Sequence, residues 1–301
     1  MTELQRYLAE EVAEDHADGI ITRREAMRRL GLLGVTGAAA ATMLAATGEA
    51  SGAAAGGGRR PRTAPDTEWG PVATEEITFQ GPRGTLMAAW AAAEEPRGGV
   101  LVIHENRGLN DHIRSVASRL AASGYSALAI DLLSEEGGTG AFPGEAEVAA
   151  ALAAIPPERF DEDMQAAVTE LSSRVRRKEV AATGFCFGGG MVWRLLTSGE
   201  RRLAAAAPFY GPFPEGGEMR RSRAAVLGIY AGLDDRVNAS QDAARAALEA
   251  ARVEHQFVVF TEADHAFFND TGARFNPAAM AEAYRRVLDW FDRFVAEGRD
   301  D

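Results

Sequence analysis

From about residue 75 onward, short apolar runs alternate with longer segments in which every third or fourth residue is apolar. The short runs predict buried strands, and the longer segments predict amphipathic helices. We expect strands at residues 76–79, 86–90, 99–103, 126–131, 180–182, 203–210, 225–230 and 254–260, and helices at residues 113–123, 145–154, 157–175, 191–196 and 239–251. This alternation predicts an α/β fold, with a mostly parallel central sheet and helices on both faces.

Two further features refine this pattern. The first two strands flank a turn at residues 81–84 and predict a hairpin at the edge of the sheet. Residues 134–160 are rich in Gly, Ala and Pro, and we interpret them as a lid or insertion that contains the helix at residues 145–154.

Residues 1–62 follow a different pattern. Arg23 and Arg24 stand ahead of an uncharged run, rich in Ala and Gly, that extends from Leu30 to Gly48. This arrangement resembles a twin-arginine export signal, whose apolar region is only weakly hydrophobic. The alternatives are a retained membrane anchor and a cytoplasmic amphipathic helix, but a run so short and so rich in Gly and Ala is a poor membrane span.

We therefore expect a twin-arginine signal peptide at residues 1–50, a flexible linker at residues 51–68 and a catalytic domain at residues 69–301. The signal peptide would bind the twin-arginine export machinery. We expect the protein to be periplasmic or extracellular, and the alternative is a cytoplasmic or membrane-tethered protein. We expect no stable membrane insertion of the mature domain and either a monomer or a homodimer.

The composition and charge of the chain exclude some classes of partner. The chain has 301 residues, of which 46% are hydrophobic and 25% charged, as in a globular protein with a substantial core. Its net charge of -12 argues against nucleic acid or an anionic membrane as a partner. The single cysteine cannot form an internal disulfide, so packing must stabilise the fold.

That cysteine, Cys186, stands in the segment G-F-C-F-G-G-G at residues 184–190, between a predicted strand and a predicted helix. The pattern is that of a nucleophile elbow, in which glycines let strand and helix approach closely, with sulfur in place of a serine oxygen. The N-terminus of the following helix favours negative charge on the sulfur or on an oxyanion beside it. A buried structural cysteine is the alternative, but the flanking glycines favour a nucleophile.

An acid and a histidine follow the elbow at the ends of later strands. Asp234 and Asp235 follow the strand at residues 225–230, and His265 follows the strand at residues 254–260. Nucleophile, acid and histidine in this order match the α/β-hydrolase triad. His265 would take the thiol proton, and a carboxylate would orient its ring. We favour Asp234 and keep Asp235 as the alternative.

Four segments together resemble the dienelactone hydrolases, or carboxymethylenebutenolidases, of the α/β-hydrolase fold. They are H-E-N-R-G-L-N at residues 104–110, G-F-C-F-G-G at residues 184–189, G-L-D at residues 232–234 and D-H-A-F at residues 264–267. The resemblance extends over about residues 70–297.

The resemblance implies an α/β-hydrolase fold and a triad of Cys186, Asp234 and His265, with Glu105 close to the thiol in the resting enzyme. It also implies an oxyanion hole built from the backbone N–H groups of Asn106 and Phe187. We expect a thiol beside Glu105, and not yet paired with His265, to stay largely protonated, because a nearby carboxylate disfavours the thiolate.

The sequence lacks the arginines with which some members of this family bind the carboxylate of their substrate. Family members that act on dienelactone hold it with arginines, one shortly after the strand that here ends at Asp131 and one four residues after the histidine. The segments D-L-L-S-E at residues 131–135 and H-A-F-F-N at residues 265–269 contain no arginine. Glu135 would repel an anionic lactone, and each lost charge-assisted bond costs about 1.5–3 kcal/mol.

Other residues could contact the substrate. Arg107 and Tyr210 are candidate substrate-binding residues. Arg107 or Arg274 could bind an anion in place of the missing arginines, or either could form a structural ion pair. We expect no metal, because His104 and Glu105 are adjacent and lack the spacing of zinc motifs. We also expect no nucleotide cofactor, because no G-x-G-x-x-G follows the first strand.

These observations predict a cysteine-dependent hydrolase of a small ester or lactone that works through a thioester acyl-enzyme. One alternative is a non-hydrolytic ligand-binding or redox-sensing protein on the same fold, since fold alone does not fix function. Another is a hydrolase of a bond that is not an ester.

Overall fold

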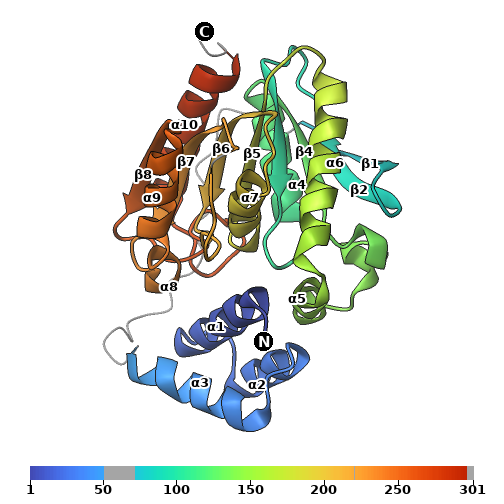
Figure 1. The fold of residues 1–301 in the computed structure, drawn as a ribbon. Helices are drawn as coiled ribbons and strands as arrows, with labels where there is room; N and C mark the ends of the chain where they lie inside the picture. Colours follow the sequence, from blue (N-terminus) through green and yellow to red (C-terminus); the bar gives the residue numbers. More distant parts are fainter. Residues whose placement is uncertain (51–71, 220, 297–301) are drawn as a thin grey trace. The chain divides into compact units, whose positions relative to one another are not determined.

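A computed structural model describes residues 1–50, 72–219 and 221–296 of the chain (Figure 1). The chain forms two compact units, one comprising Met1–Arg60 and Gly140–Ile155 and the other Pro61–Thr139 and Pro156–Asp301. We call them the helical unit and the catalytic unit. The predicted linker at residues 51–68 lies outside the described residues. Among the described residues, no helix is both long and apolar enough to cross a membrane.

The catalytic unit is built on an eight-stranded sheet with the order β1-β2-β4-β3-β5-β6-β7-β8. The strands are β1 (Glu75–Gln80), β2 (Thr85–Ala91), β3 (Gly98–Ile103), β4 (Tyr125–Asp131), β5 (Val180–Phe185), β6 (Leu203–Phe209), β7 (Ala225–Ala231) and β8 (His255–Phe260). The pairs β1–β2 and β2–β4 are antiparallel and all others are parallel. The predicted edge hairpin and the predicted α/β-hydrolase architecture are confirmed.

Helices cover both faces of this sheet. They are α4 (Asp111–Ala122), α6 (Pro157–Val175), α7 (Phe187–Thr197), α8 (Asp235–Asn238), α9 (Gln241–Ala251) and α10 (Pro277–Phe291), with the short 3₁₀-helices η1 (Ser134–Glu136) and η2 (Thr139–Ala141) and the π-helix η3 (Asp292–Ala296). The step from β3 to β4 runs opposite to the steps from β4 to β5 and onward, so right-handed crossovers place α4 on one face and α6, α7 and α9 on the other. The predicted elements did not include α10, whose Tyr284 hydroxyl lies 3.0 Å from the hydroxyl of Ser123, just after α4.

The topology brings the candidate residues to one edge of the sheet. Strand order reverses at β3, and loops at the carboxyl ends of strands on either side of such a point form the usual site of an open α/β sheet. Ile103, the last residue of β3, pairs with Gly184 of β5. This register places the loop at residues 104–110 beside the elbow.

The helical unit contains α1 (Glu3–Ala17), α2 (Arg23–Leu32), α3 (Gly37–Ala50) and α5 (Glu145–Ala154). Thr2 begins α1 with a capping box: its hydroxyl accepts from the Gln5 backbone at 3.1 Å, and its own N–H donates to the Gln5 side chain at 2.9 Å. The helix α5 contacts α1 and α2, and Arg28 forms an ion pair with Glu147 at 2.6 Å.

Two features of these segments were not predicted. The apolar run from Leu30 to Gly48 is divided between α2 and α3, because Gly34 takes a positive φ of 80° between them. The helix expected inside the insertion is present at its predicted bounds, but Gly140–Ile155 groups with the first residues of the chain and not with the sheet. The contacts of α5 with α1 and α2 explain this grouping.

Candidate active site

Cys186 occupies a strained turn between β5 and α7. Its φ of 57° and ψ of −119° are unusual for a residue with a side chain and cost of order 1–3 kcal/mol. A Cβ atom on Gly184 would lie 2.3 Å from the carbonyl oxygen of Gly188, and one on Gly188 would lie 2.3 Å from that of Ile103. Glycine is therefore required at both positions, and strand and helix cross as closely as the elbow pattern predicts.

His265 and Asp234 meet beside the elbow from the ends of β8 and β7. The Nδ1 atom of His265 lies 2.6 Å from the Oδ2 atom of Asp234, and both side chains are buried. The Oδ1 atom of Asp234 accepts a hydrogen bond of 3.0 Å from the Val237 backbone. Asp235, the alternative acid, is exposed and begins α8. The structure therefore brings Asp234, and not Asp235, to the histidine.

The sulfur lies next to this pair. The Sγ atom of Cys186 is within 4.8 Å of a ring nitrogen of His265. Burial lowers the pKa of His265, but the charges and hydrogen bonds of Asp234 and Cys186 outweigh burial and hold that pKa well above its usual range. Burial raises the pKa of Asp234, and the neighbouring His265 reverses this effect and lowers it. These two shifts favour an imidazolium paired with the carboxylate of Asp234.

The resemblance implies that Glu105 lies close to the thiol in the resting enzyme, with Cys186 not yet paired with His265, and this stays a prediction. In the structure one oxygen of the Glu105 carboxylate is held by Asn269, whose Nδ2 atom donates to Oε2 of Glu105 at 2.6 Å.

Asn269 is a site residue that sequence reasoning did not identify. We considered its position, four residues after His265, only as the place of an absent arginine. The structure shows a neutral amide there that binds the buried Glu105 carboxylate. The offset from His265 was the available signal, but sequence alone did not show which side chain the amide would meet.

His104 supports the loop after β3 through both of its ring nitrogens. Its Nε2 atom accepts a hydrogen bond from the Leu132 backbone at 3.1 Å, so Nδ1 carries the proton and donates to the Glu105 carbonyl at 2.6 Å. Burial lowers the pKa of His104. The ring is therefore a neutral support for the loop that holds Glu105 and Asn106.

The remaining predicted residues surround this centre. Phe187 is the first residue of α7, where backbone N–H groups have no partner within the helix, and Asn106 lies half-buried in the loop after β3. Tyr210 is fully buried, with its ring centroid 5.2 Å from that of His265. Burial, with Glu105 and Cys186 adding to it, raises the pKa of Tyr210 well above its usual value. Its hydroxyl has no hydrogen-bond partner among the described residues.

Two arginines were candidates for binding an anion. Arg107 is half-buried in the loop after β3. The Nε atom of Arg274 lies 3.6 Å from Asp264, which favours the ion-pair alternative for this arginine. Within the described part of the catalytic unit, no three His, Cys, Asp or Glu side chains converge as ligands for a metal ion.

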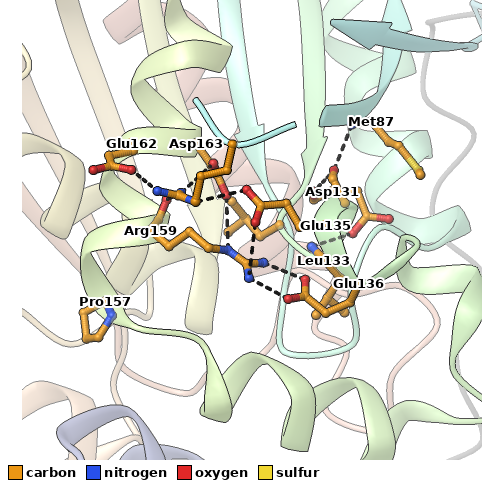
Figure 2. A network of polar contacts seen from close by, with 12 residues as sticks. Met87, Asp131, Leu133, Glu135, Glu136, Pro157, Arg159, Glu162 and Asp163 are labelled. Carbon is orange, nitrogen blue, oxygen red and sulfur yellow. Dashed lines mark hydrogen bonds and ion pairs between the residues drawn. The ribbon is translucent and has the colours of Figure 1, made fainter. Parts of the chain in front are cut away.

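Glu135, expected to repel an anionic substrate, belongs to a network of ion pairs at the base of the insertion (Figure 2). Arg83 lies 3.2 Å from Glu135 and 3.2 Å from Asp163, and Arg159 forms two hydrogen bonds of 2.6 Å with Glu136. Burial, aided by Glu135, raises the pKa of Asp163 to about 6 against the opposing effect of the two arginines. Arg83 and Arg159 thus compensate the charge of Glu135, which ties η1 to α6.

Comparison with known proteins places this geometry in a family. A model of the dienelactone hydrolase family matches residues 85–295. A candidate carboxymethylenebutenolidase of Escherichia coli O157:H7 is 29% identical over 232 residues, which cover 70% of this chain and 84% of that protein. A second, from Saccharolobus solfataricus, is 28% identical over 254 residues, which cover 73% of this chain and 98% of that protein.

Comparison with solved structures points to the same family. The crystal structure of a candidate dienelactone hydrolase from Klebsiella pneumoniae superposes with a TM-score of 0.66 and 26% sequence identity, over 75% of this chain and all of that one. The matched region contains the whole sheet from β2 onward and every residue of the Cys186 site. The chain therefore belongs to the dienelactone hydrolase family and is a dienelactone hydrolase-like hydrolase of the α/β fold.

Proposed function

We propose that the chain hydrolyses esters or lactones with Cys186 as nucleophile, His265 as base and Asp234 as the acid that orients the histidine. One observation carries the proposal: the sulfur at the strained elbow lies within 4.8 Å of a ring nitrogen of His265, and Nδ1 of this histidine lies 2.6 Å from a buried carboxylate. A nucleophile, a base within reach and a group that orients the base are the signature of covalent catalysis.

The reaction has two halves. His265 holds the thiol proton while sulfur attacks the carbonyl carbon, and the developing oxyanion accepts hydrogen bonds from the backbone N–H groups of Asn106 and Phe187. The intermediate collapses to a thioester on Cys186, and the alcohol leaves with the proton from His265. Water, deprotonated by His265, then attacks the thioester and releases the acid, which regenerates the thiol.

For the substrate, we propose a neutral ester or lactone and not an anionic dienelactone. Asn269, which lies where relatives acting on dienelactone place an arginine, donates to Glu105 and brings no positive charge. The second such position holds Glu135, whose charge is already balanced by Arg83 and Arg159. A substrate carboxylate would therefore meet Glu105 without a matched cation.

The acyl-enzyme tests this proposal directly. We expect p-nitrophenyl acetate to add one acetyl group to Cys186, detectable by mass spectrometry of the quenched protein. Cys186→Ala should lose turnover, and His265→Ala should lose roughly 10³- to 10⁴-fold in kcat/KM. His255→Ala is the matched control, because His255 lies in β8 away from the elbow. Equal turnover by wild type and Cys186→Ala would refute the cysteine mechanism.

We also propose that residues 1–50 direct export through the twin-arginine route. The proposal rests on Arg23 and Arg24 and on the Ala- and Gly-rich residues that follow them. Fractionation of cells and N-terminal sequencing should find a shortened protein outside the cytoplasm. A full-length cytoplasmic protein would contradict export and would leave the hydrolase proposal unaffected.

A further inference from the structure

The loop between β8 and α10, residues 261–276, carries His265, and it is held to the rest of the catalytic unit just beyond the histidine. Two consecutive residues, Asn269 and Asp270, make the attachments. Both attachments reach the same segment of chain, the one that leads from β3 through the Glu105 loop into α4.

The first attachment is the amide of Asn269. Its Nδ2 atom donates to Oε2 of Glu105 at 2.6 Å. Its Oδ1 atom accepts from both the backbone N–H and the hydroxyl of Thr271, at 3.0 and 2.7 Å. These bonds to Thr271 set the direction of the amide, because only the NH₂ side can face the carboxylate.

The second attachment is the carboxylate of Asp270. Its Oδ1 atom lies 3.0 Å from Nδ1 of His112, and its Oδ2 atom accepts from the guanidinium of Arg119. Only 1% of the His112 side chain is exposed. Its ring centroid lies 6.5 Å from each of the rings of Phe185 and Phe268, and Phe185 directly precedes the nucleophile.

The two attachments close a ring. Glu105 and His112 are seven residues apart on one continuous segment, and Asn110 between them begins α4 by accepting from the Ile113 backbone at 3.2 Å. From Glu105 the chain runs to His112, across to Asp270, along to Asn269 and back across to Glu105. A ring of this kind fixes the distance between the loop of Glu105 and Asn106 and the loop of His265.

We propose that His112 is a positioning residue for the hydrolysis: through Asp270 it holds the histidine loop in register with the loop that carries Glu105 and Asn106. The proposal rests on the proposed function, because Asn106 and His265 act on opposite sides of the same carbonyl. His112 touches neither substrate nor sulfur. Its loss therefore lowers kcat, which depends on the alignment of the two loops, and leaves KM nearly unchanged.

The experiment measures kcat and KM for p-nitrophenyl acetate with four full-length proteins. They are wild type, His112→Ala, His112→Asn and Asn269→Ala, each also examined for its thermal midpoint. In His112→Ala, kcat should fall about tenfold with KM within about twofold, less than the roughly 10²-fold cost of a 1 Å misplacement. His112→Asn should recover kcat to within about threefold of wild type, because its amide can donate to Asp270 from the same position as Nδ1.

The double variant His112→Ala/Asn269→Ala tests whether the two attachments act together as one closed ring of contacts or as two independent contacts. Breaking a ring at a second point adds little, so its kcat should lie within about twofold of the lower single variant. Multiplied losses, or a kcat of His112→Ala equal to wild type, would overturn the proposal. If His112→Ala does not fold, Asp270→Asn takes its place, because it keeps the size of the side chain and weakens the same bond.

Failure of this proposal differs from failure of the proposed function. A wild-type protein without turnover would contradict both proposals. An active wild type together with an unchanged kcat in His112→Ala would contradict only the positioning role of His112. Arg114→Ala is the matched control on α4, since Arg114 pairs with the exposed Glu76, and it should leave both constants unchanged.

Discussion

The described part of the catalytic unit contains two histidine–aspartate pairs with a direct side-chain contact, and they differ in what faces the far side of the imidazole. In one, Nδ1 of His265 lies 2.6 Å from Asp234, and the ring reaches toward the sulfur of Cys186. In the other, Nδ1 of His112 lies 3.0 Å from Asp270, and the ring packs against the neighbouring rings of Phe185 and Phe268. The same two residue types thus form both pairs, but one pair faces a reactive atom and the other faces the core.

The charges around the two pairs differ as well. Asp234 and Cys186 raise the pKa of His265 in spite of its burial, so that the proton is held at the reacting centre. For Asp270, burial raises the pKa, but the hydrogen bond of His112 and the charge of Arg119 prevail and lower it to about 2. A histidine–aspartate pair acts as a base only where a proton source faces it. With an arginine on the carboxylate and aromatic rings on the imidazole, the pair fastens two segments together.

The largest expected difference between the pairs is in rate. Asp234→Asn should lower kcat/KM roughly 10²- to 10⁴-fold, because an amide donates to Nδ1 and moves the histidine proton to the wrong nitrogen. Asp270→Asn should cost about tenfold or less, because it disturbs only alignment. Hydrolysis of p-nitrophenyl acetate measures both, with the exposed Asp235→Asn as control. An Asp270→Asn variant as inactive as Asp234→Asn would erase the distinction.

The next difference is in stability, at opposite ends of the pH scale. The folded pKa of Asp270 lies below its unfolded value, so its contribution is present above pH ~4 and is lost as pH falls toward 2, by about 1–2 kcal/mol. The folded pKa of His265 lies above its unfolded value, so its contribution is full below pH ~6.5 and is lost as pH rises through the folded pKa.

Urea unfolding checks both signs. Between pH 5 and pH ~2.5, wild type should lose more unfolding free energy than Asp270→Asn, and between pH 6 and pH ~9 it should lose more than His265→Gln. Parallel curves for wild type and variant in either window would contradict the assignment of that pair.

Much of the fold could be predicted, because the pattern that determines it is local. Continuous apolar runs identified β3 and β5, in which every residue is buried, and the glycines at residues 184 and 188 identified the elbow. The helix α10 was not among the predicted elements, although its buried residues recur at the three- to four-residue spacing of an amphipathic helix. The grouping of α5 with the helical unit depends on contacts between segments far apart in the chain, which periodicity does not reveal.

The same limit applies to the site. Cys186, Asp234 and His265 could be selected because motif and order mark them, and the structure brings these three together. No motif marked His112, and Asn269 was noted only for not being arginine. Their partners, Asp270 and Glu105, lie 158 and 164 residues away in the chain, so no local pattern could connect them.

The smallest expected effect separates the two partners of Asp270. Arg119→Gln should lower the unfolding free energy by about 1 kcal/mol, because one partly exposed ion pair is lost, and should change kcat less than about twofold, because His112 still holds the carboxylate. Arg114→Gln on the same helix should change stability by less than about 0.5 kcal/mol. A tenfold fall of kcat in Arg119→Gln at unchanged stability would show that the arginine, and not the buried histidine, aligns the loop of His265. The second pair would then be an arginine–aspartate clamp with a histidine packed beside it.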